Sequence, residues 1–161
     1  MRVNYLLPLS LLVIIVLPLV TAESKQVDLS IETSVADYDI GITTAAVAPD
    51  DSVVLLIGKE GYAHIISAKN PGDRSLDIEL NSARSEDFRD VAWHPRGEAA
   101  LIAGDFGTAM RYEKIDHSIT IVNGTGAILG RDMSAVAWRS AGDYAYFASN
   151  DGCLLYTSDA A

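Results

Sequence analysis

Three stretches of the sequence align on one another without a gap, and this repetition constrains the fold more than any other feature. The stretches are Ala46–Tyr62, Ala92–Thr108 and Ala137–Cys153, which begin 46 and then 45 residues apart. Each contains a small residue before a short apolar run, then a polar turn, a second apolar run and a turn with glycine at its end. A fixed period of this length is the signature of a repeat architecture. The sequence therefore predicts a fold built from equivalent modules.

The second copy shows most completely how one module is built. Four short runs rich in apolar, β-branched or aromatic residues follow one another at Phe88–Trp93, Ala99–Ala103, Thr108–Glu113 and Ser118–Val122. Turn-forming residues separate these runs, a pattern that predicts strands. The run Ala99–Ala103 is wholly apolar, which is typical of a strand buried on both faces. One period thus predicts four short antiparallel strands.

The other two copies repeat this scheme less completely. We expect their strands at Thr43–Ala48, Val53–Ile57, Tyr62–Ser67, Leu76–Leu80, Ser134–Trp138 and Tyr144–Ser149. The alternation within Leu76–Leu80 predicts an outer strand with one buried face and one wet face. Four strands per period is the blade of a β-propeller, in which radial repetition protects the sheet edges. The sequence predicts blades at residues 41–81 and 88–122 and a partial blade at 133–152.

The second copy also resembles the WD-repeat family of seven-bladed-type propellers. The resemblance rests on Trp93, on Pro95 and Gly97 in the first turn, and on Asp105 and Gly107 in the second. The third copy matches through Trp138, Gly142, Asp151 and Gly152, whereas the first has Lys59 where the family has aspartate. The Gly-His dipeptide that opens typical WD blades is missing from all three. We therefore predict an all-β fold, a divergent partial β-propeller of about two and a half four-stranded antiparallel blades.

The first 22 residues have the pattern of a secretory signal peptide. Arg2 precedes an apolar segment, Pro18 breaks it, and Val20-Thr21-Ala22 supplies small residues at a cleavage site. An uncleaved N-terminal anchor is the alternative, because the apolar segment approaches the span of a bilayer. Residues 23–40 form a lead-in in which Val27–Glu32 alternates like an outer strand. We expect the protein to be exported to the periplasm, the cell surface or the extracellular space.

The last nine residues, 153–161, resemble the conceptual translation of a sequencing-library adapter. A natural strand is the alternative interpretation, since Leu154, Leu155 and Tyr156 would pack acceptably in a sheet. On the adapter interpretation we expect the gene product to be longer and Cys153, the single cysteine, to have no redox role. We also expect a chain with fewer than three blades to expose a sheet face and an unpaired edge, and so to be marginally stable or to aggregate.

The net charge of −10 argues against nucleic acid as a partner, because its phosphates would be repelled. It is compatible with basic partners or divalent cations, and solubility of an exported domain also explains it. We expect the partner to be a protein or a small ligand. Contact with a membrane is expected only through an uncleaved N-terminal segment.

The resemblance to WD-repeat proteins implies binding through loops on one face of the propeller. The turns after the second strand of each copy lie on that face, which makes six side chains candidate ligand contacts: Lys59, Glu60, Asp105, Phe106, Asn150 and Asp151. The alternative is that the aspartates and the asparagine only form hydrogen bonds within their own turns. Asn123-Gly124-Thr125 is an N-glycosylation sequon in a chain predicted to be exported, or simply a turn.

No nucleophile–base pair, phosphate loop or paired-carboxylate motif is present, and neither a cofactor nor a metal site is predicted. His64, His94 and His117 lack metal-ligand spacing, and we expect them on the surface or in strands. Trp93 and Trp138 occupy the same repeat position, which indicates packing in the core. The sequence favours an exported, non-catalytic propeller scaffold that binds a protein or ligand. The alternative is part of an exported propeller enzyme, of hydrolase, lyase or quinone-dependent dehydrogenase type, with catalytic residues in further blades.

Overall fold

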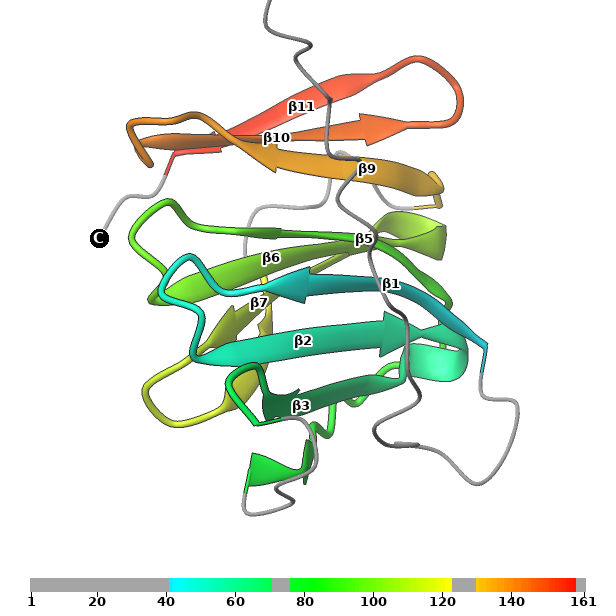
Figure 1. Ribbon diagram of the computed structural model, residues 1–161. Helices are drawn as coiled ribbons and strands as arrows, with labels where there is room; N and C mark the ends of the chain where they lie inside the picture. Colours follow the sequence, from blue (N-terminus) through cyan, green and yellow to red (C-terminus); the bar gives the residue numbers. More distant parts are fainter. Residues whose placement is uncertain (1–40, 71–75, 123–129, 159–161) are drawn as a thin grey trace, which may run out of the picture. The chain divides into compact units, whose positions relative to one another are not determined.

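A computed structural model describes residues 41–70, 76–122 and 130–158, all within the compact unit Ile31–Ala161 (Figure 1). The predicted signal peptide at 1–22, the lead-in strand Val27–Glu32 and the sequon at Asn123 lie outside the described residues. Within the described part of the chain, the regular elements are strands and short 3-10 turns. No helix in that part is long and apolar enough to cross a bilayer.

Three antiparallel sheets follow one another along the chain, and none of them closes on itself. The first sheet contains β1 (Ile42–Val47), β2 (Val53–Gly58), β3 (Ala63–Ser67) and β4 (Ile78–Glu79). The second contains β5 (Phe88–Trp93), β6 (Ala99–Gly104), β7 (Thr108–Glu113) and β8 (Ser118–Ile121). The third contains β9 (Met133–Trp138), β10 (Tyr144–Ser149) and β11 (Leu154–Ser158). The predicted all-β fold of blade-like antiparallel sheets is confirmed, and we call the sheets the first, second and third blade.

The third blade extends beyond residue 152, the boundary that the sequence suggested. Strand β11 pairs with β10 from Tyr144 opposite Ser158 to Ala148 opposite Leu154. This is the register of β6 with β7, in which Ala99 lies opposite Glu113. The segment that resembles an adapter therefore occupies the position of the third strand in a blade.

Each blade packs one face against the opposite face of the next blade. We call the face toward the following blade the forward face and the other the back face. Successive residues of β6 point to opposite faces, and they divide accordingly between two apolar clusters. Ala100 and Ile102 lie in the cluster with the first blade, whereas Leu101 and Ala103 lie in the cluster with the third. All six residues of β6 are buried, which confirms the prediction of a strand buried on both faces.

The repeated tryptophans join neighbouring blades through their polar edges. The indole Nε1 of Trp93 donates to the carbonyl of Ala46, at 2.9 Å, in the first blade. One repeat later, Nε1 of Trp138 donates to the carbonyl of Ala92 at 3.2 Å. An indole that is partly buried needs such an acceptor. The tryptophans therefore hold the blades in register as well as packing between them.

One of the three histidines, His94, differs from the expectation that they lie on the surface or in strands. His94 is only 1 % exposed although it lies in a turn, because its ring packs edge-on against Trp138 and its Nε2 lies 3.0 Å from the carbonyl of Gly142. His117 also lies in a turn, where its Nδ1 is 2.7 Å from the hydroxyl of Tyr112. Only His64 lies in a strand, β3, as expected. Contacts between turns of different blades, which the sequence does not display, account for the difference.

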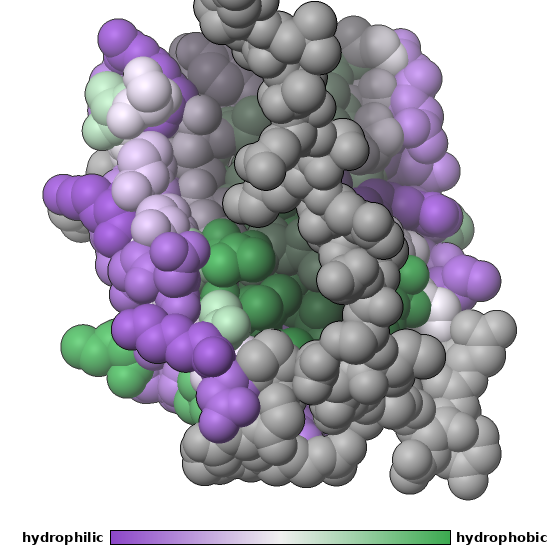
Figure 2. Space-filling view, in the orientation of Figure 1, coloured by the Kyte–Doolittle hydropathy of each residue, from purple (hydrophilic) through white to green (hydrophobic). Residues whose placement is uncertain are grey.

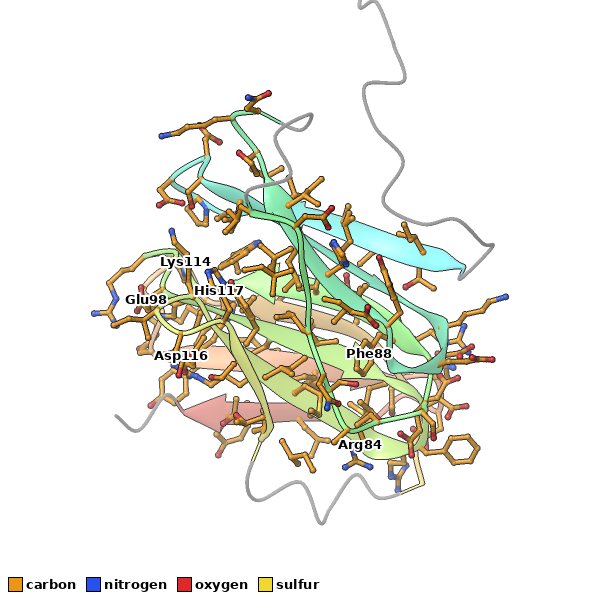
Figure 3. All side chains as sticks on the ribbon, turned by 90° about the horizontal axis from the view of Figure 1, so that it is seen from below. Arg84, Phe88, Glu98, Lys114, Asp116 and His117 are labelled. Atoms are coloured by element: carbon orange, nitrogen blue, oxygen red, sulfur yellow. The ribbon has the colours of Figure 1, made fainter. Side chains whose placement is uncertain are left out.

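The end of the strands that carries the β5–β6 and β7–β8 turns is rich in charge. Figure 3 shows Glu98, Lys114 and His117 together at this end, far from Arg84. Lys114 forms an ion pair with Asp50 of the first blade. Hydrogen bonds from Lys114 and Ser52 lower the pKa of Asp50 to about 2.

Figure 2 shows the side of β1 and β2, where apolar side chains lie in the middle and hydrophilic ones along the margins.

Candidate functional site

All six predicted ligand contacts lie in three equivalent turns. The first two turns are the 3-10 segments Lys59–Gly61 and Asp105–Gly107, which connect the second and third strands of their blades. The third, Asn150–Gly152, connects β10 and β11. We call these three turns together the turn end. Whether they form one surface depends on how the blades are joined there.

Two aspartates that the sequence analysis missed join the three turns. The side chain of Asp87 accepts a hydrogen bond from the N–H of Glu60 in the first turn, at 3.1 Å, and its carbonyl accepts one from Asp105 N–H at 2.9 Å. Asp132 repeats both contacts one blade later, with Phe106 N–H at 3.1 Å and Asn150 N–H at 3.0 Å. The structure therefore brings the predicted contacts together in one hydrogen-bonded series.

The signal for these aspartates is present in the sequence but is difficult to interpret. Asp87 and Asp132 each stand one residue before the first strand of a blade, 45 residues apart. Their carboxylates accept hydrogen bonds from backbone N–H groups of the preceding blade, and the side-chain ion pair of Asp87 with Arg89, at 3.8 Å, is only a loose one. The first blade has Gly41 at the equivalent position.

The charges of the turn end are largely neutralised within the chain. Arg89 donates to both carboxylate oxygens of Asp105, and this pair raises the pKa of the guanidinium. Arg131 pairs with Asp151, whose pKa is lowered by a hydrogen bond from Ser149 and also by the arginine. Among residues 41–70, 76–122 and 130–158, no group of three or more potential metal ligands is assembled. The carboxylates of Asp105 and Asp151 are thus engaged in ion pairs with arginines of this chain.

Phe106 is the side chain that the fold does not explain. It is 69 % exposed, and its backbone is in the left-handed region with φ at 52°. Glu60 has the same conformation in the first turn, with φ at 54°. This region disfavours bulky residues and favours Gly, Asn and Asp. Neither packing nor backbone preference accounts for an aromatic ring here.

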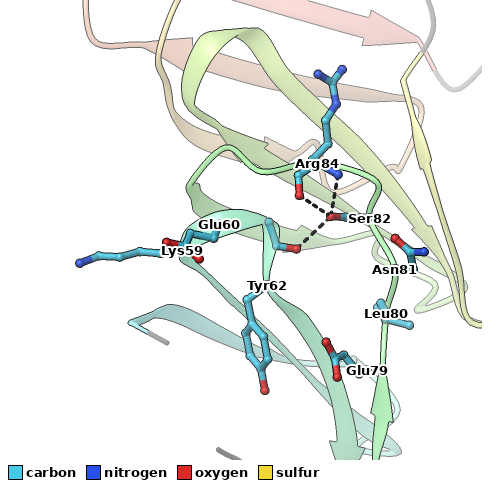
Figure 4. A pocket seen from close by; sticks show the side chains of 9 residues that line it. Lys59, Glu60, Tyr62, Glu79, Leu80, Asn81, Ser82 and Arg84 are labelled. Carbon is cyan, nitrogen blue, oxygen red and sulfur yellow. Dashed lines mark hydrogen bonds between the residues drawn. The ribbon is translucent and has the colours of Figure 1, made fainter. Parts of the chain in front are cut away.

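A pocket of about 610 Å³ adjoins the first turn. It is lined by Lys59, Glu60, Gly61, Tyr62, Glu79, Leu80, Asn81, Ser82 and Arg84 (Figure 4). Ser82 Oγ donates to the carbonyl of Gly61 at 2.9 Å and so fixes the loop against the turn. Burial, with the charges of Glu79 and Asp77, raises the pKa of Tyr62. In Figure 4 the polar ends of Lys59, Tyr62 and Arg84 point in different directions, so they do not converge on one ligand position.

Next to this pocket, His64 and Asp77 form a pair that resembles part of a catalytic dyad. Nε2 of His64 contacts a carboxylate oxygen of Asp77, and Tyr62 stacks on the imidazole with ring centroids 5.8 Å apart. Nucleophilic catalysis would require a hydroxyl or thiol on the other ring nitrogen. Nδ1 of His64 is buried and has no hydrogen-bond partner in the described part of the chain. Among the described residues, no hydroxyl or thiol therefore bonds to the imidazole as a nucleophile.

No protein-family model and no curated protein sequence matches this chain. The fold defines an all-β protein of propeller-like blades. The functional argument therefore depends on the turn end itself.

Proposed function

We propose that this protein is an exported, non-catalytic scaffold of the propeller type, which binds a protein partner or ligand through the turn end. The observation that supports the proposal is the exposed ring of Phe106, in a conformation that costs free energy. Backbone strain that persists where no packing requires it is concentrated at functional sites. A residue chosen for the turn alone would be Gly, Asn or Asp.

The surroundings of Phe106 fit a protein partner best. Aromatic side chains with a large apolar area are enriched among residues that dominate binding energy, and a polar rim typically surrounds them. Here the rim is the Arg89–Asp105 ion pair and the turn of Asn150 and Asp151. The rim is held by internal hydrogen bonds, so little order would have to be imposed on binding.

An exported propeller enzyme was the alternative. The His64–Asp77 pair is the only arrangement in the described residues that approaches a catalytic one, and no nucleophile within that part of the chain bonds to it. No specific observation therefore favours catalysis over binding.

The test compares the full chain with Phe106→Asn and with a matched control, Ile115→Asn. Ile115 is 94 % exposed and lies in the β7–β8 turn, so its substitution removes exposed apolar surface away from the turn end. The immobilised proteins are exposed to the secreted proteins and metabolites of the source cells. A partner retained by the wild type and by Ile115→Asn, but lost from Phe106→Asn, is the expected result. The absence of any partner whose retention depends on Phe106 would overturn the proposal.

A further inference from the structure

The two interfaces between neighbouring blades, which we call joints, are formed by residues at equivalent repeat positions. The forward faces contribute Ala46, Leu55, Ile57 and Ala63 in the first blade, and Ala92, Leu101, Ala103 and Ala109 in the second. The back faces that cover them contribute Phe88, Val91, Ala100 and Ile102, and then Met133, Val136, Ala145 and Phe147. Leu101 and Ala109 are each only 2 % exposed as a result. A forward face is thus a surface that another blade buries.

On the third blade, no further blade of the described chain covers the same positions. They are Ala137, Tyr146, Ala148 and Leu154, of which Tyr146 is 40 % and Leu154 is 67 % exposed. Tyr146 occupies the repeat position of Leu101, and Leu154 that of Ala109. Three of these four residues lie outside the segment 153–161. The forward face of the third blade is therefore an exposed apolar sheet face at the position of an established interface.

The turn of the third blade differs from the other two in a corresponding way. The N–H of Gly61 donates to the carbonyl of Glu86, and that of Gly107 donates to the carbonyl of Arg131, both in the lead-in of the following blade. In contrast, the N–H of Gly152 donates to Ser149 within its own turn, at 3.1 Å.

The free volume at the two glycines agrees with this difference. A Cβ added at Gly61 would lie 2.0 Å from the carbonyl oxygen of Arg84, whereas one added at Gly152 would meet nothing within 4 Å. The space that a lead-in segment fills beside the first turn is open beside the third. The N–H of Asp151, equivalent to those of Glu60 and Phe106, has no acceptor in the described chain.

We propose that the forward face of the third blade is a docking surface for a further blade of the same repeat. The lead-in of that blade carries an aspartate that accepts the N–H of Asp151, as Asp87 and Asp132 do for the first two turns. A tryptophan of its first strand donates to the carbonyl of Ala137, the position equivalent to Ala46 and Ala92. The established joints define both requirements.

A second copy of this chain does not meet these requirements. Its first blade has Gly41 where the aspartate is needed and Val47 where the tryptophan is needed. The forward face of the third blade therefore requires a blade that has both the aspartate in its lead-in and the tryptophan in its first strand.

The experiment extends the full chain by one repeat. A copy of residues 114–158 is inserted directly after Ser158, because Glu113 and Ser158 occupy equivalent positions at the ends of β7 and β11. A second insert, a copy of residues 68–113, brings Asp87 and Trp93 and guards against failure of one insert to fold. The control for the first insert carries Asp132→Ala within the copy only.

Amide hydrogen exchange at Asp151 is the first readout. We expect the extension to slow it more than about tenfold relative to the parent chain, and the control copy to lose most of that protection, because a hydrogen bond to a charged acceptor has at least this strength. Gly152→Ala is the second readout: its cost in the parent chain should be only that of the strained backbone, and it should be much larger in the extended chain, where the added Cβ would also collide with the new lead-in. Unchanged exchange at Asp151 in both extensions, or equal protection by the control copy, overturns the proposal. Self-association of the parent chain that buries Tyr146 would assign the surface to a second copy and would also overturn it.

Discussion

At the scale of single residues, different groups fix each turn and face the solvent. Hydrogen bonds of the backbone fix the turn, and the side chain of its central residue is exposed. The N–H groups of Glu60 and Phe106 are fixed by aspartates of the following blade, so the conformation does not depend on the side chain of either residue. One turn presents a carboxylate and the other an aromatic ring from the same backbone geometry. This arrangement lets the presented side chain change without loss of the fold.

A substitution at Phe106 tests this separation directly. Phe106→Asn should leave the free energy of unfolding unchanged or raise it by up to about 1 kcal/mol, because Asn tolerates the left-handed region better than Phe. Urea denaturation of the two proteins measures the difference. A decrease of more than about 1 kcal/mol would mean that the ring stabilises the fold, and would contradict a role in recognition.

Tyr112 should make stability depend on alkaline pH. Burial, with a contribution from the charge of Asp116, raises the pKa of this fully buried phenol from 10.0 to about 12. The unfolded chain therefore ionises first as the pH rises. The stability that this group contributes is present below pH ~10 and is lost between about pH 10 and 12, by up to ~3 kcal/mol.

The comparison for this prediction is Tyr112→Phe. At pH 8 the variant should lose about 1 kcal/mol, because the hydrogen bond between the hydroxyl and Nδ1 of His117 is removed. Above pH 10 its unfolding free energy should fall less steeply than that of the wild type. Parallel pH profiles for the two proteins would show that Tyr112 is not the titrating group.

Gly61 and Gly152 form a matched pair for a steric test. Both have positive φ, 71° and 85°, so an alanine is strained at either position. Only at Gly61 would the added Cβ collide with backbone, that of Arg84. Gly61→Ala should therefore be the more destabilising by at least about 1 kcal/mol in urea denaturation. Equal losses would mean that the loop at Arg84 moves aside freely.

At the scale of elements, the joint between blades combines apolar faces with a few polar contacts at fixed positions. Asp87 and Asp132 accept hydrogen bonds from one turn and, through their carbonyls, from the next. Trp93 and Trp138, the last residues of β5 and β9, add one hydrogen bond each at the opposite end of these strands. The apolar faces supply the free energy, and the polar contacts set the relative position of the strands.

Asp87→Ala should loosen the joint between the first two blades. We expect a loss of about 1 kcal/mol in the free energy of unfolding, since an exposed backbone N–H loses its charged acceptor. Asp143→Ala is the control, because Asp143 pairs with Arg139 inside a single turn and should change stability by less than about 0.5 kcal/mol. Denaturant titration measures both. Equal losses of unfolding free energy for Asp87→Ala and Asp143→Ala would show that Asp87 does not stabilise the joint.

The strands were predictable from the sequence because their signals are local. Three strands, β5, β7 and β10, begin and end at the predicted residues, and the short outer strand β4 is the least well predicted. Its apolar alternation is clear, but only two residues pair with β3. The six candidate contacts occupy equivalent positions of the repeat, and their turns lie at the same end of the blades; their role as ligand contacts stays a prediction.

Contacts between blades were not predictable, since they join residues about one period apart. His94 was expected at the surface or in a strand, yet the turn of the next blade covers it. Asp87 and Asp132 have the pattern of ordinary loop residues, because the groups that hydrogen-bond to their carboxylates are backbone N–H groups of another blade. The positive φ of Phe106 was likewise not predictable, because phenylalanine is not a residue type that indicates a left-handed backbone.

At the scale of the whole molecule, repetition creates surfaces that the chain buries at one blade and exposes at another. Leu101 and Tyr146 occupy equivalent positions, and only the first is covered by a following blade. Exposed apolar sheet faces of this kind promote association. We therefore expect any self-association of the chain to involve this face of the third blade.

The last prediction uses this pair of positions. Leu101→Lys should destabilise the fold by about 4 kcal/mol or more, because it places an unpaired charge inside the joint between the second and third blades. Tyr146→Lys should cost less than about 1 kcal/mol, because its side chain already contacts solvent, and it should reduce self-association. Thermal unfolding and light scattering across a concentration series measure the two effects. If Tyr146→Lys left the scattering of the wild type unchanged, another surface would be responsible for association.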